Sequence, residues 1–256
     1  MTIQACAELV AAGDPDRFAA TMASPAAVRD RLWPLYAFNL EIARAPWASR
    51  EAMIAEMRLQ WWIDAIGSLA EGTDRRDHPV IAALAPQLAA DPGLGLLLGG
   101  IAEARRWDCW SEPFADRATF DAYLDATSGN LVWAAARAVG APEDREPAIR
   151  DFAWGAGLAA YLCAAAELEA RGRIPFVDGR PESLRALAAE GRARLERARA
   201  AAIPRQFCPA LWPGATAAAV LARAERDPAR IATGSLGLSE FAKKWALLSR
   251  ALVGRY

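Results

Sequence analysis

The sequence lacks most residues on which metal centres and side-chain nucleophiles depend. It has one histidine, His78, which excludes a histidine metal site and any serine–histidine or cysteine–histidine pair. Its four cysteines are scattered without metal-ligand spacing, and a disulfide scaffold is not expected at this length. Phosphate-binding glycine loops are missing too, because the Gly-x-Gly pairs at 93–95 and 155–157 lack the lysine and the strand context of such loops.

An excess of charge of one sign is also missing. The chain has 30 Lys and Arg residues against 31 Asp and Glu residues. A net charge of −1 gives no general attraction to nucleic acid, which we therefore do not expect as a partner.

Long hydrophobic runs are absent. The longest weakly polar stretch, 153–166, is shorter than the roughly 20 residues that span a bilayer. The N-terminal segment carries acidic residues early and no basic region, so it does not resemble a signal peptide. We expect a cytoplasmic protein that contacts a membrane only at its surface, if at all.

Alternating β-branched residues are almost absent, which leaves little from which to build a sheet. Helical periodicity dominates instead, and we predict one all-α domain spanning residues 1–256. The apolar spacing predicts helices at 26–43, 49–70, 79–89, 94–107, 116–139, 145–168, 182–202, 214–225 and 238–252.

Local signals refine these helices. Ser24 is predicted to cap the helix at 26–43, with Pro25 at its first position, and Pro34 is predicted to kink that helix or displace its start. Met53 and Met57 are predicted to belong to a buried stripe of the helix at 49–70.

The last predicted helix is amphipathic. Its apolar residues share one face and are Phe241, Trp245, Leu248 and Leu252, beside the basic residues Lys243, Lys244 and Arg250. Packing of this face on the domain is favoured over contact with a membrane, and both alternatives stay open.

Four blocks follow one another in a characteristic order. They are RLWPLYAF at 31–38, LQWWIDA through Gly72 to HPV at 59–80, the Tyr-x4-Ser-Gly helix at 123–140, and GRIP at 172–175. In order and spacing they resemble the squalene/phytoene synthase family over roughly residues 15–180.

That resemblance implies an isoprenoid-synthase fold, a helical bundle around a long apolar cavity. Enzymes of the family join two prenyl diphosphates head to head, and two acidic clusters on facing helices hold the Mg²⁺ that assists departure of the diphosphate. The resemblance also implies substrate-binding residues, which are Tyr36, Asn39, Arg58, Trp62, Tyr123, Ser128 and Gly129.

The first acidic cluster is missing. Ala43, Arg44 and Trp47 stand where the family has aspartates, and an arginine there opposes a cation. Glu41 is the only carboxylate nearby, and a shift of two residues turns it about 200° around the helix.

The second acidic cluster is missing as well. The corresponding segment, 159–169, has five alanines among its eleven residues, and its two acids, Glu167 and Glu169, lie on opposing faces of a helix. We therefore expect no metal and no cofactor. Loss of the acids also favours a cavity filled by side chains, with Trp61 and Trp62 in the core.

Two functions remain. The segment FNLEIA at 38–43 resembles a branch of the family, one member of which assists assembly of respiratory complex I, so we favour a non-catalytic binding or assembly factor with an isoprenoid, lipid or protein partner. The alternative is a head-to-head prenyltransferase whose metal is held by other acids, such as Glu41, Glu56 or Asp121. The Asp121-x3-Asp125 pair is interpreted as a solvated helix start.

Overall fold

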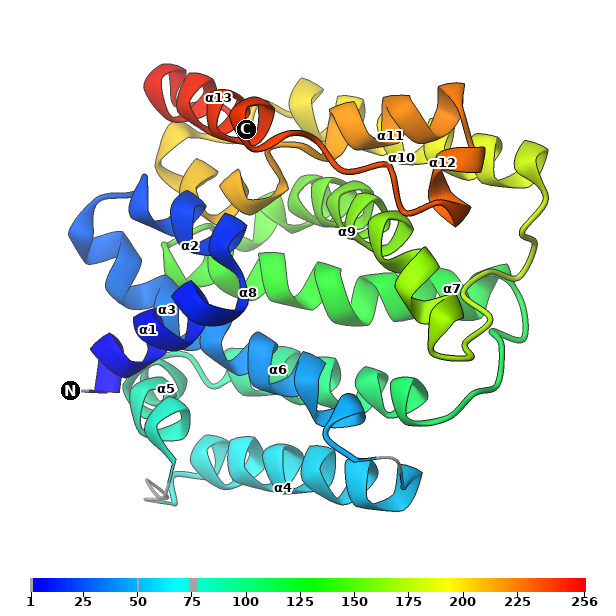
Figure 1. Cartoon of the computed structure of the whole chain (residues 1–256). Coiled ribbons are helices and arrows are strands. Elements are labelled where there is room, and N and C mark those ends of the chain that lie inside the picture. The colour runs from blue at the N-terminus through cyan, green and yellow to red at the C-terminus, as the bar shows by residue number, and fades with distance from the viewer. Residues whose placement is uncertain (1, 50, 74–77) are drawn as a thin grey trace.

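The computed structural model describes residues 2–49, 51–73 and 78–256, and every regular element within these ranges is helical (Figure 1). The α-helices are α1 (Thr2–Gly13), α2 (Pro15–Met22), α3 (Ala26–Arg44), α4 (Ala52–Ala70), α5 (Pro79–Ala90), α6 (Gly93–Ala104), α7 (Arg117–Leu124), α8 (Asn130–Ala138), α9 (Glu146–Ala170), α10 (Pro181–Ala200), α11 (Ala217–Arg226), α12 (Ala229–Ala232) and α13 (Glu240–Val253). Short 3₁₀ segments are η1 (Ala45–Trp47), η2 (Arg105–Cys109), η4 (Glu143–Arg145), η5 (Arg205–Ala210) and η6 (Trp212–Gly214), and η3 (Asp125–Gly129) is a π-helical turn.

The all-α prediction is confirmed, and the predicted segments coincide with helices to within a few residues. The segment 116–139 is divided by η3, and 94–107 ends in η2. Three of the described helices, α1, α2 and the four-residue α12, are not among the predicted ones. They are short and alanine-rich, and α1 buries only Cys6 and Val10 among its larger side chains, so their apolar periodicity is weak.

The start of α3 lies where the sequence predicts it, but the predicted cap is wrong. Pro25 occupies the N-cap position, and the Ser24 hydroxyl is buried without a partner. Pro34 does not displace the start of α3, and the helix continues through it. Burial of every residue from 32 to 38 offsets the cost of a helix-interior proline, which is about 3 kcal/mol.

Helix α9 lies at the centre of the bundle, between α8 on one side and α10 and α11 on the other (Figure 1). Glycines set its closest approach to α10, because an added Cβ at Gly155 would stand 2.9 Å from the carbonyl oxygen of Gly191. This close packing fixes the position of the α9 face that points toward α3.

Helix α4 lies at one edge of the molecule (Figure 1). The predicted burial of Met53 and Met57 is wrong, since these side chains are 69% and 66% exposed. The inner stripe of α4 consists of Ala55, Leu59, Trp62, Ala65, Ile66 and Leu69. An edge helix buries only one stripe, and the methionines lie outside it.

Helix α13 lies at the opposite edge (Figure 1). Its predicted apolar face does not pack on the domain, because Phe241, Trp245, Leu248 and Leu252 are all exposed. The inward positions are taken by Leu247 and other residues of the opposite face. Among the described residues, no helix is both long enough and apolar enough to cross a bilayer.

Candidate functional site

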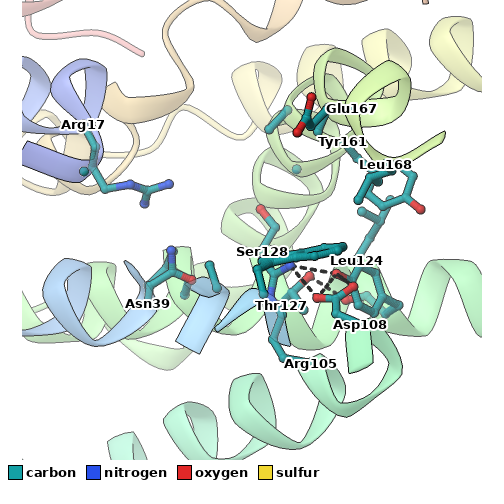
Figure 2. Close-up of a pocket in the computed structure, with 18 of the residues that line it drawn as sticks. Arg17, Asn39, Arg105, Asp108, Leu124, Thr127, Ser128, Tyr161, Glu167 and Leu168 are labelled. Atoms are coloured by element: carbon teal, nitrogen blue, oxygen red, sulfur yellow. Dashed lines mark hydrogen bonds and ion pairs between the residues drawn. The ribbon is translucent and has the colours of Figure 1, made fainter. Parts of the chain in front are cut away.

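A cavity of about 670 Å³ lies between α2, α3, η1, η2, α7, η3 and α9. Figure 2 shows Arg17 and Asn39 on one side of it, and Arg105 with Asp108 on the other. The prediction of a filled cavity is therefore wrong. Alanine and glycine positions on its walls leave the volume open, while Trp61 and Trp62 pack edge-on against each other and against His78 elsewhere.

Three of the predicted binding residues line this cavity: Asn39, Tyr123 and Ser128. Two others, Arg58 and Trp62, line a separate cavity of about 160 Å³. The structure thus divides the predicted set between two places.

Tyr36 and Gly129 do not line either cavity. The Tyr36 ring lies under the Arg17 guanidinium at 4.9 Å, its hydroxyl is buried without a partner, and burial raises its pKa to about 12. An added Cβ at Gly129 would stand 2.5 Å from a carboxylate oxygen of Asp125, so a side chain there would have to displace that carboxylate.

A buried polar network forms one wall of the cavity. Arg105 donates from Nη1 to Asp108 Oδ2 at 2.9 Å and to the Tyr123 hydroxyl at 2.8 Å, and that hydroxyl donates to Asp108 at 3.0 Å. Burial raises the pKa of Tyr123 well above its usual value, and Asp108 adds to the rise. Tyr123 is therefore held as a neutral donor to the carboxylate.

The same wall is fixed from behind by Arg173. This buried guanidinium donates to the backbone carbonyls of Asp108 and Trp107 at 2.9 and 2.8 Å, and it stacks on the Trp107 ring. The GRIP block at 172–175 thus holds η2, and η2 in turn holds Asp108.

The π-helical turn η3 forms the floor next to this network. Ser128 Oγ donates to the carbonyl of Ala153 at 2.8 Å, and Thr127 Oγ1 donates to that of Tyr123 at 2.7 Å. Gly157 of α9 permits the contact, because an added Cβ there would stand 2.5 Å from the Ser128 Cβ.

The motif positions, defined here as Ala43, Trp47, Ala160 and Ala164, also line the cavity. Ala43 and Trp47 stand where the family resemblance places acids of the first cluster, and Ala160 and Ala164 of α9 lie in the segment 159–169 that corresponds to the second. Arg44 instead lines the smaller cavity. The face that would hold Mg²⁺ is therefore present in shape, and at these four positions it lacks side-chain oxygen donors.

Two carboxylates line the cavity, and both are engaged. Asp108 is bound by Arg105 and Tyr123, and Glu167 accepts from Arg171 at 2.7 Å. Across 2–49, 51–73 and 78–256 no group of three or more His, Cys, Asp or Glu side chains is placed to hold a metal ion. This donor set does not fit the Mg²⁺ that the fold family implies, because that ion needs several free oxygen ligands.

The acids considered for a relocated metal site lie apart. Glu41 lines the smaller cavity, Glu56 accepts from the Trp110 indole at 3.0 Å, and Asp121 accepts from Arg117 at 2.8 Å. Asp125, the other half of the D-x-x-x-D pair, lies in η3 and pairs with Arg150. The structure does not bring these carboxylates together.

Sequence reasoning missed Arg17, Arg105 and Asp108. Arg17 follows the Asp14-Pro15 helix start, and its Nε donates to Asp14 at 2.9 Å. Arg105 and Asp108 lie in η2, directly after the largely apolar helix α6, and this change to charged residues is the signal that could have found them.

Comparison with known proteins agrees with this geometry. The family model for squalene/phytoene synthase matches residues 10–176. The structure is similar to the crystal structure of a dehydrosqualene synthase in complex with ligand, with a TM-score of 0.72 and 15% identity, over 98% of this chain and 95% of that chain. This likeness confirms the isoprenoid-synthase fold. No curated protein sequence matches. The chain belongs to the squalene/phytoene synthase family.

Proposed function

We propose that this protein is a non-catalytic member of its family that binds an isoprenoid or lipid in the cavity and acts as a binding or assembly factor. The observation that carries the proposal is the open cavity with Ala43, Trp47, Ala160 and Ala164 on its walls. A diphosphate leaves only when its charge is neutralised, and these side chains cannot hold the metal that does so. The volume remains available for an apolar chain.

Polar groups at one end of the cavity favour an anionic head group. Arg17 uses its Nε for Asp14 and stacks on Tyr36, and its terminal nitrogens have no hydrogen-bond partner among the residues that the structure describes. The Asn39 amide likewise has no side-chain partner there. Leu124, Leu131 and Leu168 are among the apolar residues of the remaining lining, so a molecule with an apolar tail and an anionic head matches it.

The proposal includes a protein partner and a place of action in the cytoplasm, at a membrane surface. Assembly of a respiratory complex, as in the branch that FNLEIA at 38–43 resembles, is the form we favour. Deletion of the gene is expected to lower the complex I content of the host. Unchanged complex I content would reject the assembly role and would not bear on the proposed ligand.

Purified protein with farnesyl or geranylgeranyl diphosphate tests the ligand proposal. We expect saturable binding without Mg²⁺, measured by calorimetry, and no release of diphosphate when Mg²⁺ is added. Sustained release of diphosphate would overturn the proposal in favour of a prenyltransferase.

A matched pair of variants localises the binding. Ala164→Trp places an indole in the cavity and is expected to abolish binding, while Ala193→Trp, on the exposed side of α10, should leave it intact. Both positions are exposed, so the folded state should tolerate either indole. Equal binding by both variants would place the ligand elsewhere.

A further inference from the structure

Helix α13 carries a row of large apolar side chains on its outer face. Phe241, Trp245 and Leu252 are 76%, 61% and 72% exposed, and Leu248 between them is half exposed. Spacings of four, three and four residues place them within about 60° of one another around the helix. The Phe241 and Trp245 rings stack on each other, so the row is continuous.

The opposite face of α13 is turned toward the body and is mixed in character. Leu247 and Ala251 pack against the domain there, the Lys243 ammonium pairs with Asp16 of α2 at 2.8 Å, and Arg250 is half-buried. The larger apolar side chains nevertheless lie on the outer face, which is the reverse of an ordinary surface helix.

The chain after α13 fixes this orientation. The Trp212 indole donates to the carbonyl of Arg255 at 2.9 Å, and the Tyr256 hydroxyl donates to that of Ala198 at 2.6 Å. The Tyr256 ring packs edge-on against Phe152. Both ends of the helix are therefore anchored with the apolar row outward.

Positive charge gathers at the same edge. Residues 239–256 hold four cations and one acid, whereas the whole chain has a net charge of −1. Arg199 faces the small cavity that Arg250 lines, and the Arg205 guanidinium lies against Gly254. Lys244, Arg199, Arg205 and Arg255 are all exposed.

We propose that α13 docks the protein on a membrane surface that carries anionic lipids, with the apolar row in the interfacial layer and the cations beside it. A helix with large apolar residues on one side and basic residues around them binds such surfaces. A second copy of the chain fits less well, because a two-fold interface would set the same cationic edge against itself. This inference goes beyond the cavity function and does not depend on a bound ligand.

Flotation of the purified protein with phosphatidylcholine vesicles, with and without phosphatidylglycerol, tests the proposal. We expect binding to the anionic vesicles that weakens as salt is raised, and little binding to neutral ones. The double variant Phe241→Ser/Trp245→Ser is expected to lower partitioning by about tenfold or more. The control Met53→Ser/Met57→Ser removes an equally exposed apolar pair from α4 and should leave partitioning unchanged.

Several results would overturn the proposal. These are the absence of vesicle binding, equal binding to neutral vesicles, or equal loss in the α4 control. Sedimentation analysis can give one further contrary result. If the protein is a dimer in solution and Phe241→Ser/Trp245→Ser makes it a monomer, the apolar row contacts a second copy of the chain. Because all four substituted side chains are exposed, unchanged thermal melting is expected and would separate lost docking from lost folding.

Discussion

Two parts of the wall of one cavity differ in whether they carry charged side chains. The network wall consists of Arg105, Asp108 and Tyr123, and the motif positions are Ala43, Trp47, Ala160 and Ala164. On the network wall Asp108 is buried and paired with Arg105, which is mostly buried. The four motif positions carry no charge, and Arg44, which also stands in place of an aspartate, lines the smaller cavity instead. Carboxylates that face each other without a metal repel, and alanine removes that repulsion. This chain therefore keeps charged side chains where other protein groups pair with them. It has no carboxylates at the four motif positions, where only a bound ion would neutralise them.

The largest expected effect comes from breaking the network wall. Asp108→Ala leaves the Arg105 guanidinium without its carboxylate in a buried place, and we expect the free energy of unfolding to fall by about 3–5 kcal/mol. Urea denaturation measures this fall.

Glu167→Ala is the matched change at the cavity rim. The Glu167–Arg171 pair is exposed to solvent, so its loss should cost less than about 1 kcal/mol. Equal losses of unfolding free energy for Asp108→Ala and Glu167→Ala would show that the network wall contributes no more to stability than the exposed pair at the rim.

A second change tests the contact between the π-helical floor and α9. Gly157→Ala forces its Cβ onto the Ser128 side chain, and we expect a loss of about 1–3 kcal/mol in urea denaturation. Gly99→Ala in α6 has nothing within 4 Å and should be neutral or slightly stabilising. If Gly157→Ala leaves the free energy of unfolding unchanged, the π-helical turn shifts readily to make room for the added methyl group.

A third change restores charge at two motif positions. Ala160→Asp/Ala164→Asp puts two carboxylates four residues apart on one face of α9, which faces the cavity. At a Mg²⁺ concentration ten times its Kd, bound ion should stabilise the variant by about 1.4 kcal/mol. Thermal melting with and without Mg²⁺ measures this, and the unchanged chain should not respond. A response of the unchanged chain would contradict the assignment of these walls as metal-free.

The smallest change concerns Tyr36, whose buried hydroxyl has no partner. Tyr36→Phe removes that unsatisfied group and is expected to stabilise the protein by about 1 kcal/mol. Because burial raises the folded-state pKa of Tyr36 from 10.0 to about 12, the unfolded chain loses its proton first as pH rises, and stability should fall between these values. The variant should lack this part of the alkaline loss. Lower stability of Tyr36→Phe at neutral pH would reveal a hydroxyl partner.

Much of the fold follows from periodicity and from the four sequence blocks. The predicted helix at 145–168 is α9 (Glu146–Ala170), because apolar spacing over such a length leaves little ambiguity. The missing acids at Ala43 and in 159–169 can also be recognised from the sequence, because comparison with the motifs of the family requires only residue identities.

The rest depends on contacts that periodicity does not encode. The network joins Arg105 and Asp108 to Tyr123 across a turn, and no local spacing predicts that meeting. Alanine at 160 and 164 is compatible with tight packing and with an open wall, so the cavity was not predictable. Amphipathicity shows that α13 has two faces, but the anchors at its two ends decide which one points inward.

The π-helical turn at Asp125–Gly129 affects which changes in chain length the protein can accommodate. A π turn holds one extra residue between two stretches of ordinary helix. Removing one residue from it would leave a regular helix from 117 to 138 with its two ends where they are now. A one-residue deletion, which would shift the two halves of an ordinary helix out of register, could therefore be absorbed at this place, next to the cavity floor.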